Sequence, residues 1–161
     1  MCGIIGYLGN QDTKNILLNG LKKLEYRGYD SIGIATITAS QELSITKTSG
    51  KFPTLKKAIV DHPTNNLYGI GHTRWATHGK PSKTNSHPHS DCTQKIAVVH
   101  NGIIENYREL REELTISGHN IVSETDSECI PHMIEDYIAK GHSISQATQL
   151  TASRLEGSNA V

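Results

Sequence analysis

The sequence lacks a net charge, a long apolar run and a signal-like N-terminus. Lys plus Arg and Asp plus Glu number 16 each among the 161 residues, so no overall field favours nucleic acid or an anionic membrane as a partner. No apolar run approaches the roughly 20 residues that span a bilayer, and no basic-then-apolar segment opens the chain. A hydrophobic content of 35% over this length is sufficient for one domain with a core. These features predict a cytoplasmic single-domain protein that binds neither nucleic acid nor membranes.

Cysteine is also scarce, and its spacing argues against both disulfides and a zinc site. Cys2, Cys92 and Cys129 cannot all pair and lie far apart, which favours free thiols in a reducing compartment. No Cys-x-x-Cys or His-x-x-x-His unit is present. The residues weighed as metal ligands are His72, His78, His87, His89, Cys92 and His100. Their spacing favours histidines that orient loops by hydrogen bonds, and the sequence predicts no metal.

What the sequence does have is a cysteine directly behind the initiator methionine. If Met1 is removed, Cys2 carries a thiol and a free α-amine on one residue. Groups of these kinds titrate near ~8.5 and ~8, so the amine can take the thiol proton at neutral pH. The alternative is that Cys2 is a small buried hydrophobic residue that opens a strand. Position alone leaves both interpretations open.

Hydrophobic periodicity predicts alternating strands and helices. The predicted strands are 2–8, 32–37, 43–48, 68–73 and 95–100, the second and third of them forming a hairpin. The predicted helices are 13–24, 52–60, 105–115, 126–139 and 144–155. Thr125 or Asp126 is expected to cap the fourth helix, and Ser143 with Gln146 has capping-box spacing for the fifth. Residues 80–93 contain no predicted element, which is typical of a working loop or a disordered segment.

Polar clusters follow predicted strands or turns at 27–30, 74–79, 100–102 and 124–126. Loops at strand ends often carry binding and catalytic residues, because the sheet holds them in place. A cysteine that attacks an amide needs oxyanion donors, which Asn101 and the N–H of Gly102 can supply. The Arg74 fork suits an α-carboxylate and Asp126 suits an α-ammonium, so an amino-acid substrate is plausible. Each feature also has an ordinary explanation: Asn101-Gly102 is a common turn dipeptide, Asp126 suits a helix N-cap, and Arg74 could form a surface ion pair.

Five blocks together resemble one known family. They are Met1–Gly6, Leu24–Ser31, His72–Gly79, His100–Asn106 and Ser123–Asp126. In this order, over nearly the whole chain, they resemble the glutaminase domain of glutamine-fructose-6-phosphate aminotransferase, also called glucosamine-6-phosphate synthase. Amidophosphoribosyltransferase shares the N-terminal Cys-Gly-Ile motif. The motifs Tyr-Arg-Gly-Tyr and Thr-Arg-Trp-Ala-Thr-His-Gly, however, favour the glucosamine-forming family.

The resemblance implies an α+β fold of the N-terminal-nucleophile hydrolases, a four-layer αββα sandwich typical of class II glutamine amidotransferases. Cys2 would attack the side-chain amide of L-glutamine to form a thioester and release ammonia, with its own α-amine as base. The other implied roles are Asn101 and Gly102 as oxyanion hole, Arg27 beside the nucleophile, Trp75 as ammonia gate, and Arg74, Thr77, His78 and Asp126 around glutamine. No metal or organic cofactor is implied.

The chain also departs from the family pattern. Family members continue with further strands and an isomerase domain that binds fructose 6-phosphate, and full-length members are expected to be homo-oligomeric. Residues 1–161 are therefore expected to form a partial type 2 glutamine amidotransferase domain that cannot make glucosamine 6-phosphate unaided. The alternative is an inactive truncated fragment that acts at most as a glutamine-binding or association module.

Overall fold

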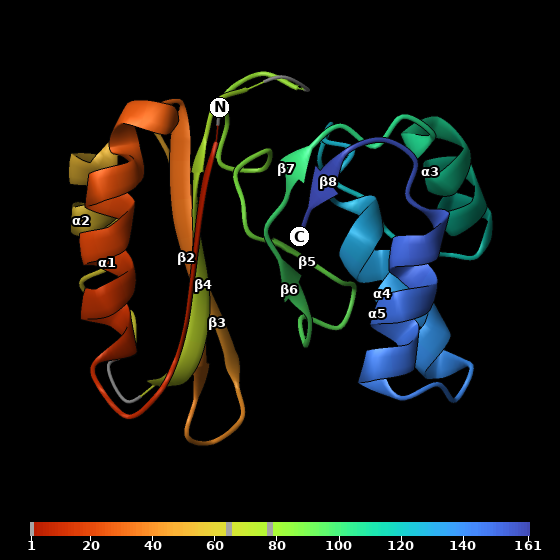
Figure 1. Cartoon of the computed structure of the whole chain (residues 1–161), viewed down its shortest axis with the longest axis horizontal. Coiled ribbons are helices and arrows are strands. Elements are labelled where there is room, and N and C mark those ends of the chain that lie inside the picture. Colours follow the sequence, from red (N-terminus) through yellow and green to blue (C-terminus); the bar gives the residue numbers. More distant parts are fainter. Residues whose placement is uncertain (1, 64–65, 77–78) are drawn as a thin grey trace.

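The computed structural model describes residues 2–63, 66–76 and 79–161, and these form four layers (Figure 1). Helices α1 (Thr13–Leu24) and α2 (Phe52–Ala58) make the first layer, and a four-stranded sheet makes the second. Short paired strands make the third layer, and helices α3 (Tyr107–Ile116), α4 (Cys129–Ala139) and α5 (Ile144–Arg154) make the fourth. The predicted α+β sandwich of αββα order is confirmed.

The four-stranded sheet brings distant parts of the chain to one edge. Strands β1 (Gly3–Leu8), β4 (Asn66–Arg74), β2 (Ser31–Thr38) and β3 (Leu43–Ser49) lie in that order and are all antiparallel. Gly3 pairs with Thr73, and Ser31 pairs with Arg74. Consequently the start of β1, the start of β2 and the end of β4 meet at the same end of the sheet.

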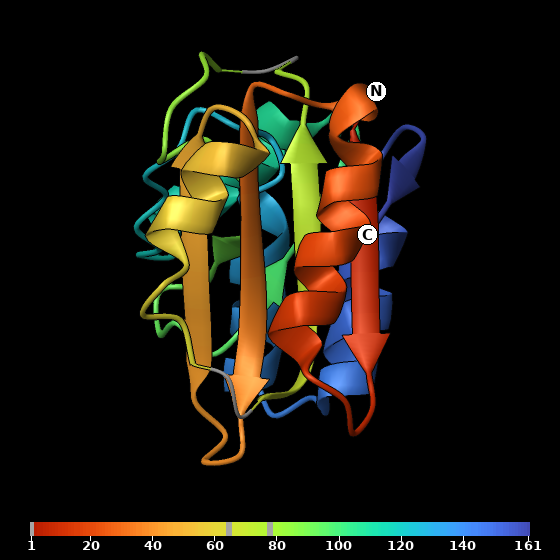
Figure 2. The ribbon, with the colours of Figure 1, turned by 90° about the vertical axis from the view of Figure 1, so that its left-hand side faces the viewer.

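Helices α1 and α2 cover the outer face of this sheet (Figure 2). Helix α1 begins because the side chain of Asp12 accepts a hydrogen bond from the Asn15 N–H at 3.1 Å. Its buried leucines, Leu17 and Leu21, lie four residues apart and therefore on one face of the helix. A first apolar cluster forms there, comprising Leu17, Leu21, Ile32, Ile34, Leu55 and Ile59. Residues 2–63 and 66–76, with this cluster, are called the main-sheet half below.

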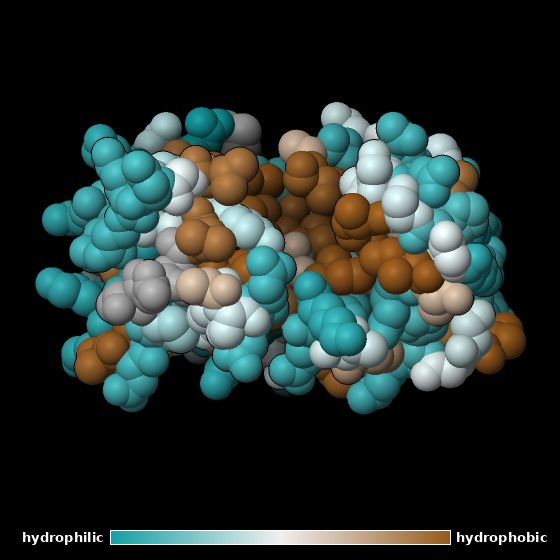
Figure 3. All heavy atoms as spheres, turned by 90° about the horizontal axis from the view of Figure 1, so that it is seen from below, coloured by the Kyte–Doolittle hydropathy of each residue, from teal (hydrophilic) through white to brown (hydrophobic). Residues whose placement is uncertain are grey.

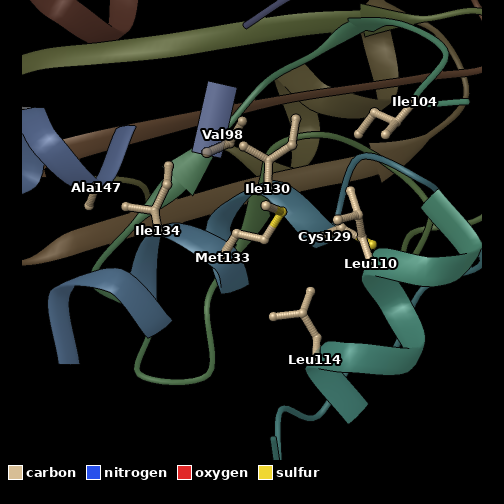
Figure 4. Close-up of a cluster of buried hydrophobic side chains, with 9 residues drawn as sticks. All are labelled: Val98, Ile104, Leu110, Leu114, Cys129, Ile130, Met133, Ile134 and Ala147. Carbon is tan, nitrogen blue, oxygen red and sulfur yellow. The ribbon is translucent and has the colours of Figure 1, made fainter. Parts of the chain in front are cut away.

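Residues 79–161, called the helical half, have a separate core. Strand β5 (His89–Ser90) pairs with β6 (Ala97–Val98), and β7 (Asn101–Gly102) pairs with β8 (Asn159–Ala160). Helix α5 begins with the predicted capping box, in which Ser143 and Gln146 each bond the other's backbone. Side chains from β6, α3, α4, α5 and the segment between β7 and α3 converge in Figure 4, namely Val98, Ile104, Leu110, Leu114, Cys129, Ile130, Met133, Ile134 and Ala147.

Three sequence predictions need correction. The strand expected over 95–100 is shorter, because only Ala97–Val98 finds a paired strand within it, and Asn101–Gly102 forms a separate strand with another partner. The helix expected from residue 126 begins at Cys129, and no side chain caps it. The helix expected over 52–60 ends at Ala58.

Residues 80–93 are mostly held in place by buried contacts. Lys47 on β3 donates from Nζ to the carbonyls of Ser86 at 2.7 Å and Pro88 at 2.9 Å. Burial lowers the pKa of Lys47 to about 8, because it disfavours the charged ammonium. His89 Nε2 lies 3.0 Å from Thr125 Oγ1, and His87 Nδ1 accepts the His100 N–H at 3.3 Å. The prediction that histidines orient loops is confirmed for these residues.

Polar groups make part of the contact between the two halves. The rings of His72 and His87 stack at 4.2 Å, and His87 lies edge-on to His89 at 4.6 Å. Seen from the side of the β2–β3 turn, apolar residues gather around a hollow near the middle of the surface (Figure 3). Among the described residues, no helix combines the length and apolar character needed to cross a bilayer.

Candidate active site

A pocket of about 540 Å³ lies where the start of β1 and the end of β4 face β7. Every predicted site residue that the structure describes lines it: Cys2, Arg27, Arg74, Trp75, Asn101, Gly102 and Asp126. Thr77 and His78, also predicted around the substrate, lie outside the described residues. Residues from five separated stretches of the chain therefore share one cavity.

Cys2 lies directly before the first residue of β1, and its sulfur contacts the Arg74–Trp75 turn. The Gly3 N–H donates to Thr73 Oγ1 at 3.2 Å, which holds the first residues of β1 on β4. The sulfur of Cys2 accepts the Trp75 N–H at 3.1 Å and lies 3.5 Å from the Trp75 carbonyl. Cys2 is partly exposed and borders the pocket. The interpretation of Cys2 as an inert buried residue is therefore disfavoured.

Asn101 reaches Cys2 across the gap between the halves. Its Nδ2 donates to the Cys2 carbonyl at 3.3 Å, and its Oδ1 lies 2.9 Å from His72 Nε2. A carbonyl can only accept, so this contact fixes which end of the amide faces Cys2. His72 Nε2 must then be the donor to Oδ1. Burial lowers the pKa of His72 to about 4, which keeps the ring neutral at pH 7.

Gly102 occupies a position that only glycine suits. Its φ is +144°, and an added Cβ would lie 2.4 Å from the Ser158 carbonyl oxygen and 2.9 Å from His100 Nε2. Gly102 pairs with Asn159 in the β7–β8 ladder. The tight approach of the β8 segment therefore sets the wall of the pocket beside Asn101.

The pocket contains one buried cationic side chain and one buried acidic side chain. Arg74 is almost fully buried and donates from Nη2 to the Gly79 carbonyl at 3.3 Å. Burial lowers the pKa of Arg74, while the nearby Cys2, Asp30 and Asp126 oppose that shift. Asp126 Oδ2 accepts the Ile104 N–H at 2.8 Å, so this carboxylate anchors the pocket wall and does not cap α4. The alternative of Arg74 as a surface ion pair is wrong, since the residue is buried.

The loop before β2 supports the Arg74–Trp75 turn. Asp30 donates its N–H to the Arg74 carbonyl at 3.0 Å, and its carboxylate accepts the Ala76 N–H at 2.7 Å. A Cβ on Gly28 would lie 2.7 Å from the Thr73 carbonyl oxygen, so glycine is needed for this close approach. The Trp75 ring lies 5.2 Å from the Tyr29 ring and is 44% exposed. The tryptophan is thus held beside the pocket with one side open to solvent.

Comparison with known proteins agrees with this arrangement. The family described as glutamine amidotransferase domain matches residues 72–161. The chain belongs to the glutamine amidotransferase family. The resemblance seen in the five sequence blocks is confirmed.

The relatives named glutamine–fructose-6-phosphate aminotransferase [isomerizing] are much longer than this amidotransferase chain. The protein of Methanococcus maripaludis is 51% identical over 152 residues, which are 94% of this chain and 25% of that protein. The protein of Pyrococcus horikoshii is 50% identical over 163 residues, covering 100% of this chain and 27% of that protein. The chain therefore spans about a quarter of the length of these relatives.

Solved structures of amidotransferases share the fold. Glutamine phosphoribosylpyrophosphate amidotransferase from B. subtilis, complexed with ADP and GMP, superposes with a TM-score of 0.78 at 25% identity. A structure described as the allosteric regulatory enzyme of purine biosynthesis gives 0.83 at 26% identity. In each case the match covers 98% of this chain and 34% of the other. The fold is that of the class II, N-terminal-nucleophile amidotransferases.

Several lining residues of the amidotransferase pocket were not predicted as site residues. They are His87, His100, Ile103, Glu105, Thr125, Ser127 and Ser158. His100 bridges two of the segments, with Nδ1 2.7 Å from Ser127 Oγ and Nε2 2.9 Å from Asn159 Oδ1. Its position directly before Asn101, at a strand end, was the available signal. Among the described residues, the one group of side chains close enough to share a metal ion lies outside this pocket.

Proposed function

We propose that this chain hydrolyses the side-chain amide of L-glutamine through a thioester on Cys2. The observation that supports this most is the shared pocket: a cysteine sulfur, an amide donor and a pair of opposite charges line one cavity. Its relatives are named glutamine–fructose-6-phosphate aminotransferase, so the ammonia would serve the synthesis of glucosamine 6-phosphate from fructose 6-phosphate. Residues 1–161 would act as the glutaminase unit in that reaction.

The chemical steps follow from the residue types. Once Met1 is removed, the α-amine of Cys2 takes the thiol proton, and the thiolate attacks the amide carbon of glutamine. The tetrahedral intermediate collapses to a thioester as the protonated amine returns its proton to the leaving nitrogen, which departs as ammonia. Water then attacks the thioester, and glutamate leaves with the thiol restored.

Asn101 and Gly102 are proposed to stabilise the oxyanion. The Asn101 side-chain nitrogen has two hydrogens, and one of them bonds the Cys2 carbonyl. The second can reach an oxygen that forms next to the sulfur. A donor of this kind is worth about 2.7–4 kcal/mol of transition-state stabilisation in other acyl-transfer enzymes.

Arg74 and Asp126 are proposed to hold the two ends of the amino acid. The guanidinium fork suits the α-carboxylate of glutamine, and the Asp126 carboxylate suits its α-ammonium. Thr77 and His78 complete the proposed substrate site, while Arg27 and Trp75 would close it beside the nucleophile, with Trp75 as the gate for ammonia. No cofactor takes part in this proposal.

The test is covalent labelling of Cys2 by a glutamine analogue. Met1-processed protein incubated with 6-diazo-5-oxo-norleucine should gain one adduct that peptide mass spectrometry locates on Cys2. The Cys2→Ala variant should gain none and should release no ammonia from glutamine. In the original chain, the exposed thiol of Cys92 and the buried thiol of Cys129, both outside the pocket, should carry no adduct. An unlabelled Cys2 in folded, processed protein would refute the proposal.

A further inference from the structure

Four potential metal ligands converge on the helical half, outside the amidotransferase pocket. They are Cys92, His119, His132 and Glu135, and their ligand atoms all lie within 4.8 Å of one another. Cys92 lies in the turn between β5 and β6, and His119 lies between α3 and α4. His132 and Glu135 are three residues apart on α4 and share one face of that helix. Other residues of α4, namely Ile130, Met133 and Ile134, contribute to the core, as Figure 4 shows.

Four of the distances among the ligand atoms match those of a tetrahedral zinc site, and all of the atoms lie within 4.8 Å of one another. Tetrahedral zinc with bonds of about 2.3 Å to sulfur and about 2.0–2.1 Å to nitrogen or oxygen sets sulfur and nitrogen about 3.6 Å apart, and nitrogen and oxygen about 3.3 Å apart. Here Cys92 Sγ lies 3.7 Å from His119 Nδ1 and 3.4 Å from His132 Nδ1. Glu135 Oε2 lies 3.1 Å from His119 Nδ1 and 3.5 Å from His132 Nδ1.

The groups around the cluster also suit a metal. The Asn120 N–H donates to Cys92 Sγ at 3.4 Å, and the Cys92 N–H donates to Glu135 Oε2 at 3.1 Å, so backbone donors stabilise both anionic ligands. His132 Nε2 is buried and faces Glu128 Oε1 at 3.8 Å. A carboxylate behind the second ring nitrogen is the usual way in which a zinc-bound histidine is oriented.

Hydrogen bonds alone explain the arrangement less well. With the His132 proton on Nε2, facing Glu128, Nδ1 offers a lone pair toward both the sulfur of Cys92 and the carboxylate of Glu135. The Cys92 thiol can donate to Nδ1, but Nδ1 and Glu135 Oε2 still face each other at 3.5 Å as two acceptors, and two acceptors repel one another. A cation at their centre removes that repulsion.

We propose that Cys92, His119, His132 and Glu135 bind one zinc ion in a closed, four-coordinate structural site. Thiolate, imidazole and carboxylate donors in tetrahedral geometry favour zinc over the harder Mg²⁺ and Ca²⁺. The ion joins the β5–β6 turn, the α3–α4 connection and α4. Glu128 extends this support, because its carboxylate accepts the N–H groups of Val122 at 3.0 Å and Ser123 at 2.5 Å, just before the pocket residues Thr125 and Asp126.

The first test is metal content. Untagged chain purified in zinc-containing buffer should hold one zinc per chain by plasma mass spectrometry. Replacing zinc by Co²⁺ should give the intense visible bands of tetrahedral cobalt together with a near-ultraviolet thiolate-to-cobalt transition. Cys92→Ala should remove the thiolate transition, and Cys92→Ala and His119→Gln should each weaken zinc binding by at least 100-fold. Glu128→Gln should weaken it about 10- to 100-fold.

Matched controls separate this site from other thiols and histidines. Cys2→Ala and His142→Gln remove the same side-chain types elsewhere and should keep one zinc. If a ligand variant does not fold, the original chain still decides: bound zinc should protect Cys92 from iodoacetamide. A folded chain that binds no zinc, a cobalt form without a thiolate transition, or unchanged zinc in both ligand variants would overturn the proposal.

Discussion

His72 should control catalysis without touching the substrate, and the variant His72→Phe tests this. In the folded chain, His72 Nε2 donates to Asn101 Oδ1 at 2.9 Å, which leaves the Asn101 amide nitrogen facing Cys2. Phenylalanine can keep the ring stack on His87, whose centroid lies 4.2 Å away, but it has no donor. The partly buried Asn101 oxygen then lacks this partner, and the amide is no longer held in its orientation.

The expected cost follows from the loss of that one donor. A buried acceptor left without its hydrogen bond costs about 1–3 kcal/mol. If this cost falls on the orientation of Asn101, kcat for glutamine hydrolysis drops about 5- to 150-fold, since about 1.36 kcal/mol corresponds to a tenfold change. KM for glutamine should change less than twofold, because Arg74 and Asp126 hold the substrate ends.

Steady-state ammonia release from glutamine, measured on Met1-processed protein, gives both constants. His72→Gln should recover part of kcat, because its amide can donate in place of the imidazole. In an Asn101→Ala background, which by itself should cost about 10²–10³ in kcat, His72→Phe should have little further effect. Equal effects of His72→Phe in both backgrounds, or a normal kcat in a folded single variant, would refute the reasoning.

Three further outcomes are expected. Asp126→Asn should raise KM for glutamine about 10- to 150-fold by weakening a charge-assisted contact, measured as ammonia release, with Glu109→Gln on α3 as a neutral comparison. Burial and the nearby Lys14 lower the pKa of His62 to about 4 in the folded chain, whereas the usual pKa of histidine is ~6.5. Between these two pH values the unfolded chain therefore binds more protons than the folded chain. The free energy of unfolding, measured in urea, should therefore fall by up to about 3 kcal/mol from pH 7 to 4, and His62→Gln should make this fall smaller. An equal fall in the variant would contradict the role given to His62. Gly28→Ala should destabilise the chain by about 1–3 kcal/mol in urea, because its Cβ meets the Thr73 carbonyl at 2.7 Å; unaltered stability would be evidence against that contact.

The sequence predicted the elements whose pattern is local. The strands of the main sheet have apolar runs or, in β3, an alternation of apolar and polar residues, and α5 has its capping box, so these elements were recognised from neighbouring residues alone. Strands β5 and β7 were not recognised, and β6 was expected to be longer, because two-residue strands exist only through their partners, and β7 pairs with a segment near the far end of the chain. Periodicity contains no information on such pairs.

The sequence predicted which residues line the pocket better than it predicted the contacts that each of them makes. Strand-end clusters and family resemblance identified its main lining residues, yet Asp126 looked equally suited to cap a helix until its bond to Ile104 was seen. The cluster of Cys92, His119, His132 and Glu135 was missed because it joins three separated segments. Its sole local signal is the pair on α4, and of the residues weighed as metal ligands from sequence only Cys92 belongs to it.

The polar contact between the two halves has a consequence for acid tolerance. Each half has its own apolar cluster, whereas His72, His87 and His89 at the contact between them are buried, and burial lowers their pKa values. Because the pKa of His72 is about 4 and those of His87 and His89 are also lowered, only acid of about pH 4 or below protonates these rings, and it should separate the two halves while each keeps its apolar core. Activity should therefore vanish at a higher pH than helical structure does, with the pocket split along the line where Cys2 faces Asn101.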